Sequence, residues 1–418
     1  MNSIRSWRGE WVQQICGKDT IEFRLALGVT QSREKSELRI TLNVSIFMML
    51  VYIAEFTLLI RTLFPDYERS YTVKESAIVL NQRRNLPPFC FARHLKDPGG
   101  RTMTEPSIDW NTGERSEFVD IGTHRLRLTA LGCSRNPCDP AVLIIPGLGS
   151  SITSWAAVRR QLAQFIRVYS YDRSGYGESD LSTETPTSTT IAYELDLLLR
   201  KARVAPPFIV VAHSWGGILS REFLAVRPDY VTGMVFVEAN QEQTLARLDW
   251  RLLANSPILT GVDRAKVLKT DSSHKLTVEE WEVYQAAEAT EKHQKQAALE
   301  YEQYPHSFPV LAAKSQLKRD PPILGSRPVC VIKGDNGRDF QELFRAGIEI
   351  GNGNESERAA FKDILSTWDE NDQALQMGNL KLSSRQNYFQ VPLSGHHLQL
   401  TAPDGIVRGV KWVVENIK

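Results

Sequence analysis

The stretch Val210-Val211-Ala212-His213-Ser214-Trp215-Gly216-Gly217 places a serine between an apolar run and an amphipathic segment. The run Phe208–Ala212 predicts a buried strand, and the segment from Gly217 predicts a helix. A serine in so tight a strand–turn–helix takes a strained backbone conformation, and small residues two positions before and after it avoid clashes across the turn. The pattern predicts a nucleophile elbow at Ser214, although a serine that caps a helix fits the stretch by itself equally well.

The chain around this stretch alternates short apolar runs with Gly-rich turns and amphipathic segments from residue 117 onward. This alternation is typical of an α/β fold, a mostly parallel sheet covered by helices. We predict strands at Phe118–Ile121, Arg125–Leu131, Ala141–Ile145, Arg167–Tyr171, Phe208–Ala212, Val231–Val237, Val329–Ile332 and Tyr388–Val391. We predict helices at Thr153–Ala163, Thr189–Ala202, Gly217–Val226, Glu357–Thr367 and Pro403–Ile417.

Two loops next to predicted strands carry groups suited to acyl transfer. Ile144-Ile145-Pro146-Gly147-Leu148-Gly149 ends in a Gly-rich turn, so we expect the N–H groups of Leu148 and Trp215 to converge on an oxyanion. Pro392-Leu393-Ser394-Gly395-His396-His397 precedes the final helix, and an imidazole there can exchange a proton with Ser214. A third loop, which contains Asp172 and Arg173, is predicted to order the site rather than react.

Together and in this order, these motifs resemble the α/β-hydrolase superfamily, of the AB hydrolase-1 type and its fungal members in particular. The resemblance covers residues 117–418. Pro146–Gly149 stands where the family has its His-Gly oxyanion turn, Asp172–Ser179 matches the loop D-R-x-G-x-G-x-S, and Gly395-His396 matches the histidine loop. The resemblance favours His396 over His397, and it implies an eight-stranded, mostly parallel sheet flanked by helices, with a helical cap insertion.

The resemblance also implies the chemistry. It indicates a cofactor-independent serine hydrolase, esterase- or lipase-like (EC 3.1), that cleaves an ester, thioester or small amide through an acyl-enzyme intermediate. Ser214 argues against the epoxide-hydrolase and dehalogenase branches, which use an aspartate nucleophile. Lyases and perhydrolases of the same fold remain alternatives, as does a non-catalytic, membrane-tethered interaction protein. The similarity to hydrolases of fungal biosynthetic clusters indicates a role in secondary metabolism.

The acid of the catalytic triad is ambiguous in the sequence. The order serine, acid, histidine allows Glu238, at the end of one predicted strand, and Asp335, just after another. The spacing G-x-x-D, usual for the family, fails after Gly334. We therefore predict Glu238 as the acid, with Asp335 as the alternative and Asp339 as a third candidate.

The chain divides into three parts in this interpretation. Residues 1–116 form an N-terminal extension, 117–240 and 326–418 form the hydrolase core, and 241–325 form the cap. Within the cap, Thr277 and Glu280 form a predicted capping box that opens a helix running to about Tyr304. Trp281 and Tyr284 on that helix are predicted to be packing residues.

Composition excludes several other classes of protein. The 50 Lys+Arg and 49 Asp+Glu residues give a net charge of +1, without the basic excess of a nucleic-acid binder. The 5 cysteines are scattered, so they form no disulfide framework, and no zinc-binding motif is present. The balance favours an uncharged or weakly polar substrate, and the resemblance implies a small molecule that contains an ester-like bond.

The apolar run Ile40–Ile60 is long enough to span a bilayer and contains one charged residue, Glu55. We predict a single-pass, membrane-associated protein, with a slight preference for a cytoplasmic N-terminus. The alternative is an amphipathic helix that is buried or docked on a surface, in an otherwise cytoplasmic protein.

Alkaline carbonate extraction tests this prediction. An integral helix at 40–60 keeps the full chain in the membrane pellet, because high pH removes peripheral proteins and leaves spanning ones in place. A chain that starts after residue 100 serves as the control and is expected in the supernatant. Release of the full chain into the soluble fraction would refute the spanning helix.

Overall fold

The computed structural model describes residues 11–15, 21–25 and 108–417. Its contacts divide the chain into two units, Met1–Leu86 and Pro87–Lys418. In the first unit, strands β1 (Trp11–Ile15) and β2 (Ile21–Leu25) pair antiparallel. The candidate membrane helix at 40–60 lies outside the described residues. Within the described ranges, no helix combines the length and the apolar character that crossing a bilayer requires.

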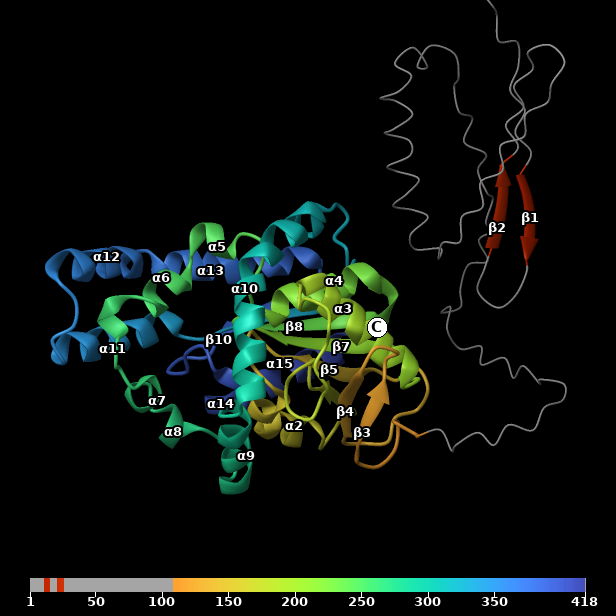
Figure 1. Cartoon of the computed structure of the whole chain (residues 1–418), viewed down its shortest axis with the longest axis horizontal. Coiled ribbons are helices and arrows are strands. Elements are labelled where there is room, and N and C mark those ends of the chain that lie inside the picture. The colour runs from red at the N-terminus through yellow and green to blue at the C-terminus, as the bar shows by residue number, and fades with distance from the viewer. Residues whose placement is uncertain (1–10, 16–20, 26–107, 418) are drawn as a thin grey trace, which may run out of the picture. The chain divides into compact units, whose positions relative to one another are not determined.

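The second unit contains a sheet of eight strands in the order β10-β9-β8-β7-β5-β6-β4-β3 (Figure 1). Strand β4 runs antiparallel to both of its neighbours, and the other neighbouring pairs are parallel. The α/β fold and the eight predicted strands are confirmed, with ends shifted by a few residues at most. The strands are β3 (Arg115–Asp120), β4 (Arg125–Leu131), β5 (Ala141–Ile145), β6 (Val168–Tyr171), β7 (Phe208–His213), β8 (Val231–Val237), β9 (Val329–Lys333) and β10 (Gln386–Gln390).

Both faces of the sheet are buried, because alternate residues of each strand point to opposite faces. Leu143 and Val210 pack under helices α3 (Ser188–Lys201) and α4 (Gly216–Val226). Their neighbours Ile144 and Val211 pack under α2 (Ala156–Leu162) and α15 (Pro403–Asn416). The continuous apolar runs of the sequence are therefore strands of a sheet that is covered on both sides.

Helices from two separate insertions form the cap. The first insertion, between β8 and β9, contains α5 (Thr244–Arg247), α6 (Trp250–Ala254), α7 (Arg264–Val267), α8 (Thr270–Ser273), α9 (Val278–Glu288) and α10 (Glu291–Ala313). The second, between β9 and β10, contains α11 (Asn336–Glu349), α12 (Glu355–Ser366) and α13 (Trp368–Gly378). Leu253 and Ile258 of the first insertion share one buried cluster with Phe361 and Trp368 of the second. The segment 326–418, interpreted from the sequence as core, thus contributes helices that pack with the cap.

The predicted helix from Thr277 to about Tyr304 is two helices. The capping box of Thr277 and Glu280 is present at the start of α9, which ends at Glu288. The Thr290 side chain then accepts a hydrogen bond from the His293 N–H and begins α10. A threonine in this position satisfies a free N–H of a new first turn, so it favours a break that hydrophobic spacing does not reveal.

Candidate active site

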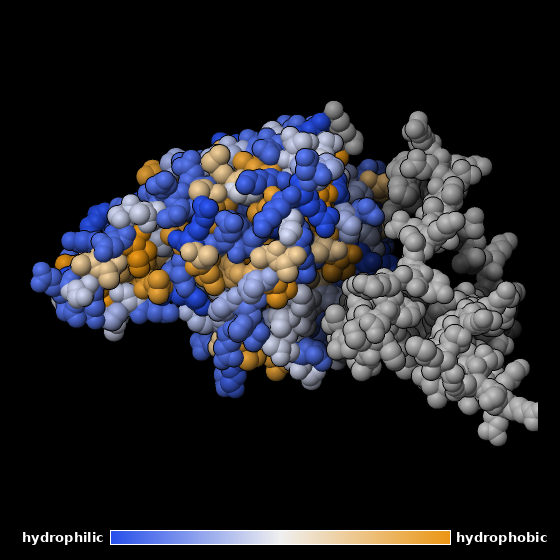
Figure 2. Space-filling model, turned by 90° about the horizontal axis from the view of Figure 1, so that it is seen from above, coloured by the Kyte–Doolittle hydropathy of each residue, from blue (hydrophilic) through white to orange (hydrophobic). Residues whose placement is uncertain are grey.

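A cavity of about 1000 Å³ lies between the carboxyl ends of the strands and the cap. Ligands of open α/β sheets bind at this edge, because the loops that follow the parallel strands meet there. Ser214, Glu238, His396 and Leu148 all line the cavity. The face seen in Figure 2 mixes hydrophilic residues with scattered hydrophobic ones, whereas the cavity wall is predominantly apolar.

Ser214 occupies a strained position between β7 and α4. Its φ of 52° lies in the left-handed region, which residues with a side chain rarely adopt. Three backbone hydrogen bonds hold it there. The Ser214 N–H donates to Val237 O (3.2 Å), and its carbonyl accepts from the N–H groups of Gly217 (2.9 Å) and Asn240 (2.8 Å). The turn has the geometry of the predicted elbow, with Ser214 at the cavity wall.

The turn after β5 lies directly beside this serine. A Cβ atom on Gly147 would collide with the Ser214 side chain, so only glycine allows this approach. Arg173 donates hydrogen bonds to the carbonyls of Pro146 (3.1 Å) and Gly147 (2.8 Å), which agrees with its predicted ordering role. The N–H groups of Leu148 and Trp215 donate no hydrogen bond to any residue in the described part of the chain. Both donors are available to an oxyanion.

His396 and Glu238 lie next to one another. The His396 Nδ1 atom is 3.7 Å from Glu238 Oε2, within ion-pair range but longer than a hydrogen bond. The other carboxylate oxygen of Glu238 accepts the Gly334 N–H at 2.5 Å. Glu238 is 2% exposed, at a φ of 45°. The structure therefore places His396 beside Glu238, and both line the same cavity as Ser214.

The other two candidate acids have different partners. The Asp335 N–H donates to Ser394 O (2.7 Å), while its side chain makes no hydrogen bond or ion pair with the described residues. Asp339 pairs with Arg338 at 2.8 Å, and its carboxylate packs so closely on Gly395 that a Cβ there would collide with it. These contacts support the histidine loop without reaching the His396 ring.

His213, next to the serine, was not singled out in the sequence. Its buried Nε2 atom donates to the His396 carbonyl at 2.8 Å and so holds the histidine loop. Burial lowers the pKa of His213 well below its usual value, so the ring is neutral at pH 7. His397 lines the same cavity, with its Nδ1 atom 3.4 Å from Gln399 Nε2. The position of His213 beside the elbow serine is the one sequence signal for its role.

A buried lysine and a second buried acid affect the pKa values of Glu238 and His396. Lys333 Nζ lies 3.0 Å from Asp372, a residue of α13 that the sequence did not identify. Burial raises the pKa of Glu238 to about 7, although Lys333 opposes this. Burial also raises the pKa of Asp372 to about 6 and lowers that of His396, which Asp372 and Asp339 oppose. A lowered pKa keeps the His396 ring in the neutral form that a general base requires.

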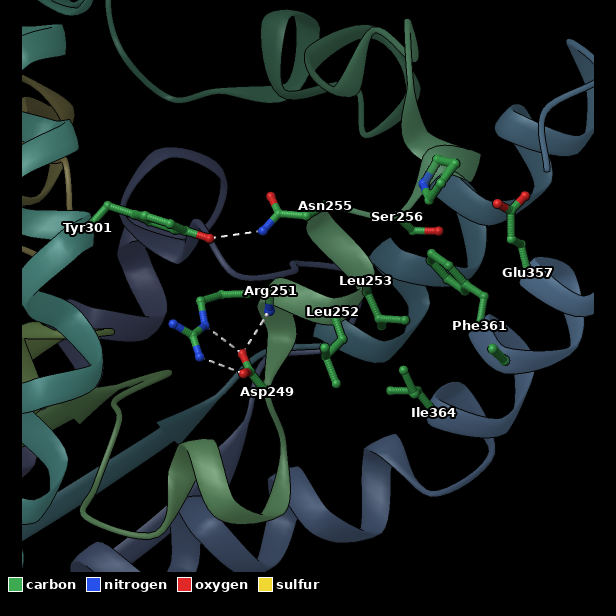
Figure 3. Close-up of a pocket in the computed structure, with 12 residues that line it drawn as sticks. Asp249, Arg251, Leu252, Leu253, Asn255, Ser256, Tyr301, Glu357, Phe361 and Ile364 are labelled. Atoms are coloured by element: carbon green, nitrogen blue, oxygen red, sulfur yellow. Dashed lines mark hydrogen bonds and ion pairs between the residues drawn. The ribbon is translucent and has the colours of Figure 1, made fainter.

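A second pocket, of about 520 Å³, lies between α6 and α12 (Figure 3). It contains none of the predicted site residues. Its charged groups already have partners, since Asp249 binds Arg251 (2.6 Å) and Glu357 accepts the Asn354 N–H (2.8 Å). The larger cavity is therefore the candidate active site.

Comparisons with known proteins agree with this architecture. Residues 142–408 match the model of the Alpha/beta hydrolase family. An "AB hydrolase superfamily protein" of Gibberella zeae is 32% identical over 322 residues, which are 73% of this chain and 97% of that protein. A protein of Hormonema carpetanum named "Probable transporter efuK" is 30% identical over 319 residues, 73% of this chain but 44% of that longer protein.

Solved structures are similar at lower sequence identity. A haloalkane dehalogenase from Bradyrhizobium elkanii, the DbeA-M1 loop variant, has a TM-score of 0.49, with 19% identity over 73% of this chain and 98% of that one. A serine hydrolase of carbazole degradation, CarC, has a TM-score of 0.46 with 14% identity over 72% of this chain and 99% of that one.

The raised pKa of Glu238 predicts a pH-dependent stability. Its ordinary value is 4.5 and its folded value about 7, so its protonated form contributes stability that is complete below pH 4.5 and lost as pH rises through 7. Glu238→Gln cannot lose a proton. From pH 4.5 to pH 8, the free energy of unfolding of this variant should therefore rise relative to wild type by on the order of 2–3 kcal/mol, as measured by urea titration.

The exposed glutamate Glu282 on α9 provides the matched control. Glu282→Gln measures the effect of the substitution itself at the two pH values. If the stability difference of Glu238→Gln changes with pH no more than that of Glu282→Gln, the Glu238 carboxyl titrates near its ordinary value.

Proposed function

Because this chain belongs to the alpha/beta hydrolase family, we propose that it is a cofactor-independent serine hydrolase that cleaves an ester, thioester or small amide. Ser214 is the nucleophile, His396 the general base and acid, and Glu238 the carboxylate that orients His396. The observation that supports the proposal is that these three residues line one cavity, with His396 Nδ1 3.7 Å from Glu238 Oε2.

The reaction has two halves. His396 takes the Ser214 proton as the oxygen attacks the substrate carbonyl, and the N–H groups of Leu148 and Trp215 bind the developing oxyanion. His396 then gives the proton to the leaving alcohol, thiol or amine, and the acyl group stays on Ser214. Water, deprotonated by His396, releases the acid and restores the serine.

The cavity wall supports a largely apolar substrate. Trp250, Leu343, Trp368 and Leu375 line it, and the volume of about 1000 Å³ holds a group much larger than acetate. Burying such a group contributes about 25 cal/mol per Å² of apolar surface. We therefore propose an ester-like substrate that is uncharged or weakly polar and has a bulky apolar part.

Attachment to a membrane through residues 40–60 is a separate proposal, which rests on the apolar run in the sequence. The name of the Hormonema carpetanum relative, a transporter, is compatible with it. Such attachment would bring the cavity near apolar substrates, but the proposed chemistry does not require it.

A fluorophosphonate probe tests the nucleophile. The wild-type chain should become covalently labelled, because an activated serine displaces fluoride from the probe and becomes phosphonylated, and Ser214→Ala should lose the label completely. Intact-mass spectrometry measures both. Ser366→Ala changes an exposed serine at the end of α12 and should leave labelling unchanged. Full labelling of Ser214→Ala would exclude Ser214 as the nucleophile.

Turnover of an activated ester distinguishes the acids. Glu238→Gln should lower kcat by about 10³- to 10⁴-fold, because His396 loses the group that orients it and stabilises its charged form. Asp335→Asn is the matched control, and its kcat should stay within a few-fold of wild type. If Asp335→Asn shows the large loss and Glu238→Gln does not, the acid is Asp335.

A further inference from the structure

Helix α10 of the cap contacts the two loops that shape the proposed oxyanion site. It crosses the core near α3 and α4 (Figure 1). Lys292 and His293 in its first turn, and Glu300 two turns later, fall on the same side of the helix. Lys292 Nζ donates to Gly177 O (2.7 Å), and His293 Nε2 donates to Gly149 O (2.9 Å). One face of α10 is therefore bonded to the backbone beside the cavity.

Glu300 and Arg173 form a buried, two-point ion pair between α10 and the core. Arg173 Nε donates to one carboxylate oxygen of Glu300 and Nη2 to the other, each at 2.8 Å. The Glu300 side chain is 0% exposed and the Arg173 side chain is 2% exposed. The Tyr176 ring lies over the guanidinium, 5.0 Å from its carbon, and closes the pair from above. A bidentate pair of this kind fixes the plane of the guanidinium as well as its position.

The guanidinium in turn fixes one peptide unit. Its remaining N–H groups bind the carbonyls of Pro146 (3.1 Å) and Gly147 (2.8 Å). In a trans peptide unit the C=O and the following N–H point in opposite directions. Holding the Gly147 carbonyl towards Arg173 therefore directs the Leu148 N–H to the opposite side of the unit, away from the guanidinium.

Glu300 also binds the backbone on the other side of Leu148. One of its carboxylate oxygens accepts the Gly149 N–H at 3.1 Å. The Glu300 carboxylate thus holds the turn on both sides of Leu148. It holds Gly147 through Arg173, and it binds Gly149 directly. A rotation of the Gly147–Leu148 peptide would break the hydrogen bond to Gly147 O and leave buried charge incompletely paired, which is costly.

We propose that Glu300 is a positioning residue, which acts with Arg173 to hold the Leu148 N–H in the orientation that binds the oxyanion. The inference rests on the proposed serine-hydrolase function. In this proposal the cap both covers the substrate and holds an oxyanion donor of the core in place. It also explains how the turn is ordered with Pro146 at a position where the family has histidine.

The test separates a positioning role from a merely structural one. Glu300→Gln keeps the shape and removes the charge, whereas Arg173→Met combined with Glu300→Leu replaces both charges by apolar groups. Such double replacement of a buried pair often restores stability, but it cannot restore the hydrogen bonds to the turn. The control is Asp196→Asn, which removes the charge of a buried acid on α3 that pairs with the partly exposed Arg227 and lies outside the cavity.

Three quantities are measured on folded protein: thermal stability, the rate constant of fluorophosphonate labelling, and kcat and KM for an activated ester. We expect Glu300→Gln to lose labelling rate and kcat by about 10-fold or more and the double variant by about 10²-fold, with KM nearly unchanged, because one oxyanion donor contributes 10²- to 10³-fold. Asp196→Asn should lose stability but keep the labelling rate. A stable double variant that is labelled at the wild-type rate would overturn the inference.

Amide hydrogen exchange of the segment 146–151, followed by mass spectrometry, makes the test independent of activity. Exchange should be faster in Glu300→Gln, where the Gly149 N–H loses a charged acceptor, faster still in the double variant, where leucine offers no acceptor, and unchanged in Asp196→Asn. A wild-type chain that the probe does not label would contradict the proposed function, but the exchange comparison would still stand. Unchanged exchange in the Glu300 variants would overturn the role of Glu300 in holding the turn.

Discussion

The close approach of two backbone turns is the constraint on which the site depends. The turn after β5 and the turn between β7 and α4 lie against each other, and side chains at Gly147 or Gly216 would prevent the contact. Ser214 has its left-handed φ in the second turn, and the strain is balanced by backbone hydrogen bonds from both neighbouring segments. Because β5 and β7 are adjacent parallel strands, their ends bring a serine and free N–H groups to the same point.

Buried charge surrounds this point, and each charge has a compensating partner. Lys333 lies beside Asp372 and lowers the cost of burying Glu238, while Arg173 and Glu300 neutralise one another under the oxyanion turn. In an environment of low dielectric such pairs hold their geometry strongly, since separating them leaves a charge without solvent or partner. The site is therefore rigid where the proposed chemistry needs fixed donors, and apolar where the substrate binds.

The cap is part of this rigid arrangement at one end. Helix α10 is bonded to the loops of the core, whereas α6, α11 and α13 line the cavity and pack with α12 in an apolar cluster of their own. The two insertions depend on each other, because residues such as Phe361 and Leu253 bury their side chains against the opposite insertion. This arrangement leaves a large, mostly apolar cavity beside Ser214, while α10 stays bonded to the turn after β5.

Local pattern was sufficient for the strands, the elbow and the histidine loop. Apolar runs bounded by glycine-rich turns predict strands wherever a sheet is covered on both faces, and Ser214, Leu148 and His396 stand at strand ends that the periodicity itself reveals. The sequence did not predict the break between α9 and α10, because the hydrophobic spacing is compatible with a helix on both sides of Thr290. The Thr290 side chain caps a new helix there.

The tertiary structure alone decided which acid lies beside His396 and which charges surround it. Glu238, Asp335 and Asp339 all follow predicted strands, and only the packing of the histidine loop against β8 and β9 distinguishes their distances to the ring. Asp372 and Glu300 lie in helices with several similar acids, so no local signal separates them from solvent-exposed ones. The sequence by itself determined the sheet and the order of the candidate site residues along the chain. Their pairing depends on contacts between residues far apart in sequence, which form only when the histidine loop packs against β8 and β9 and when α10 packs on the core.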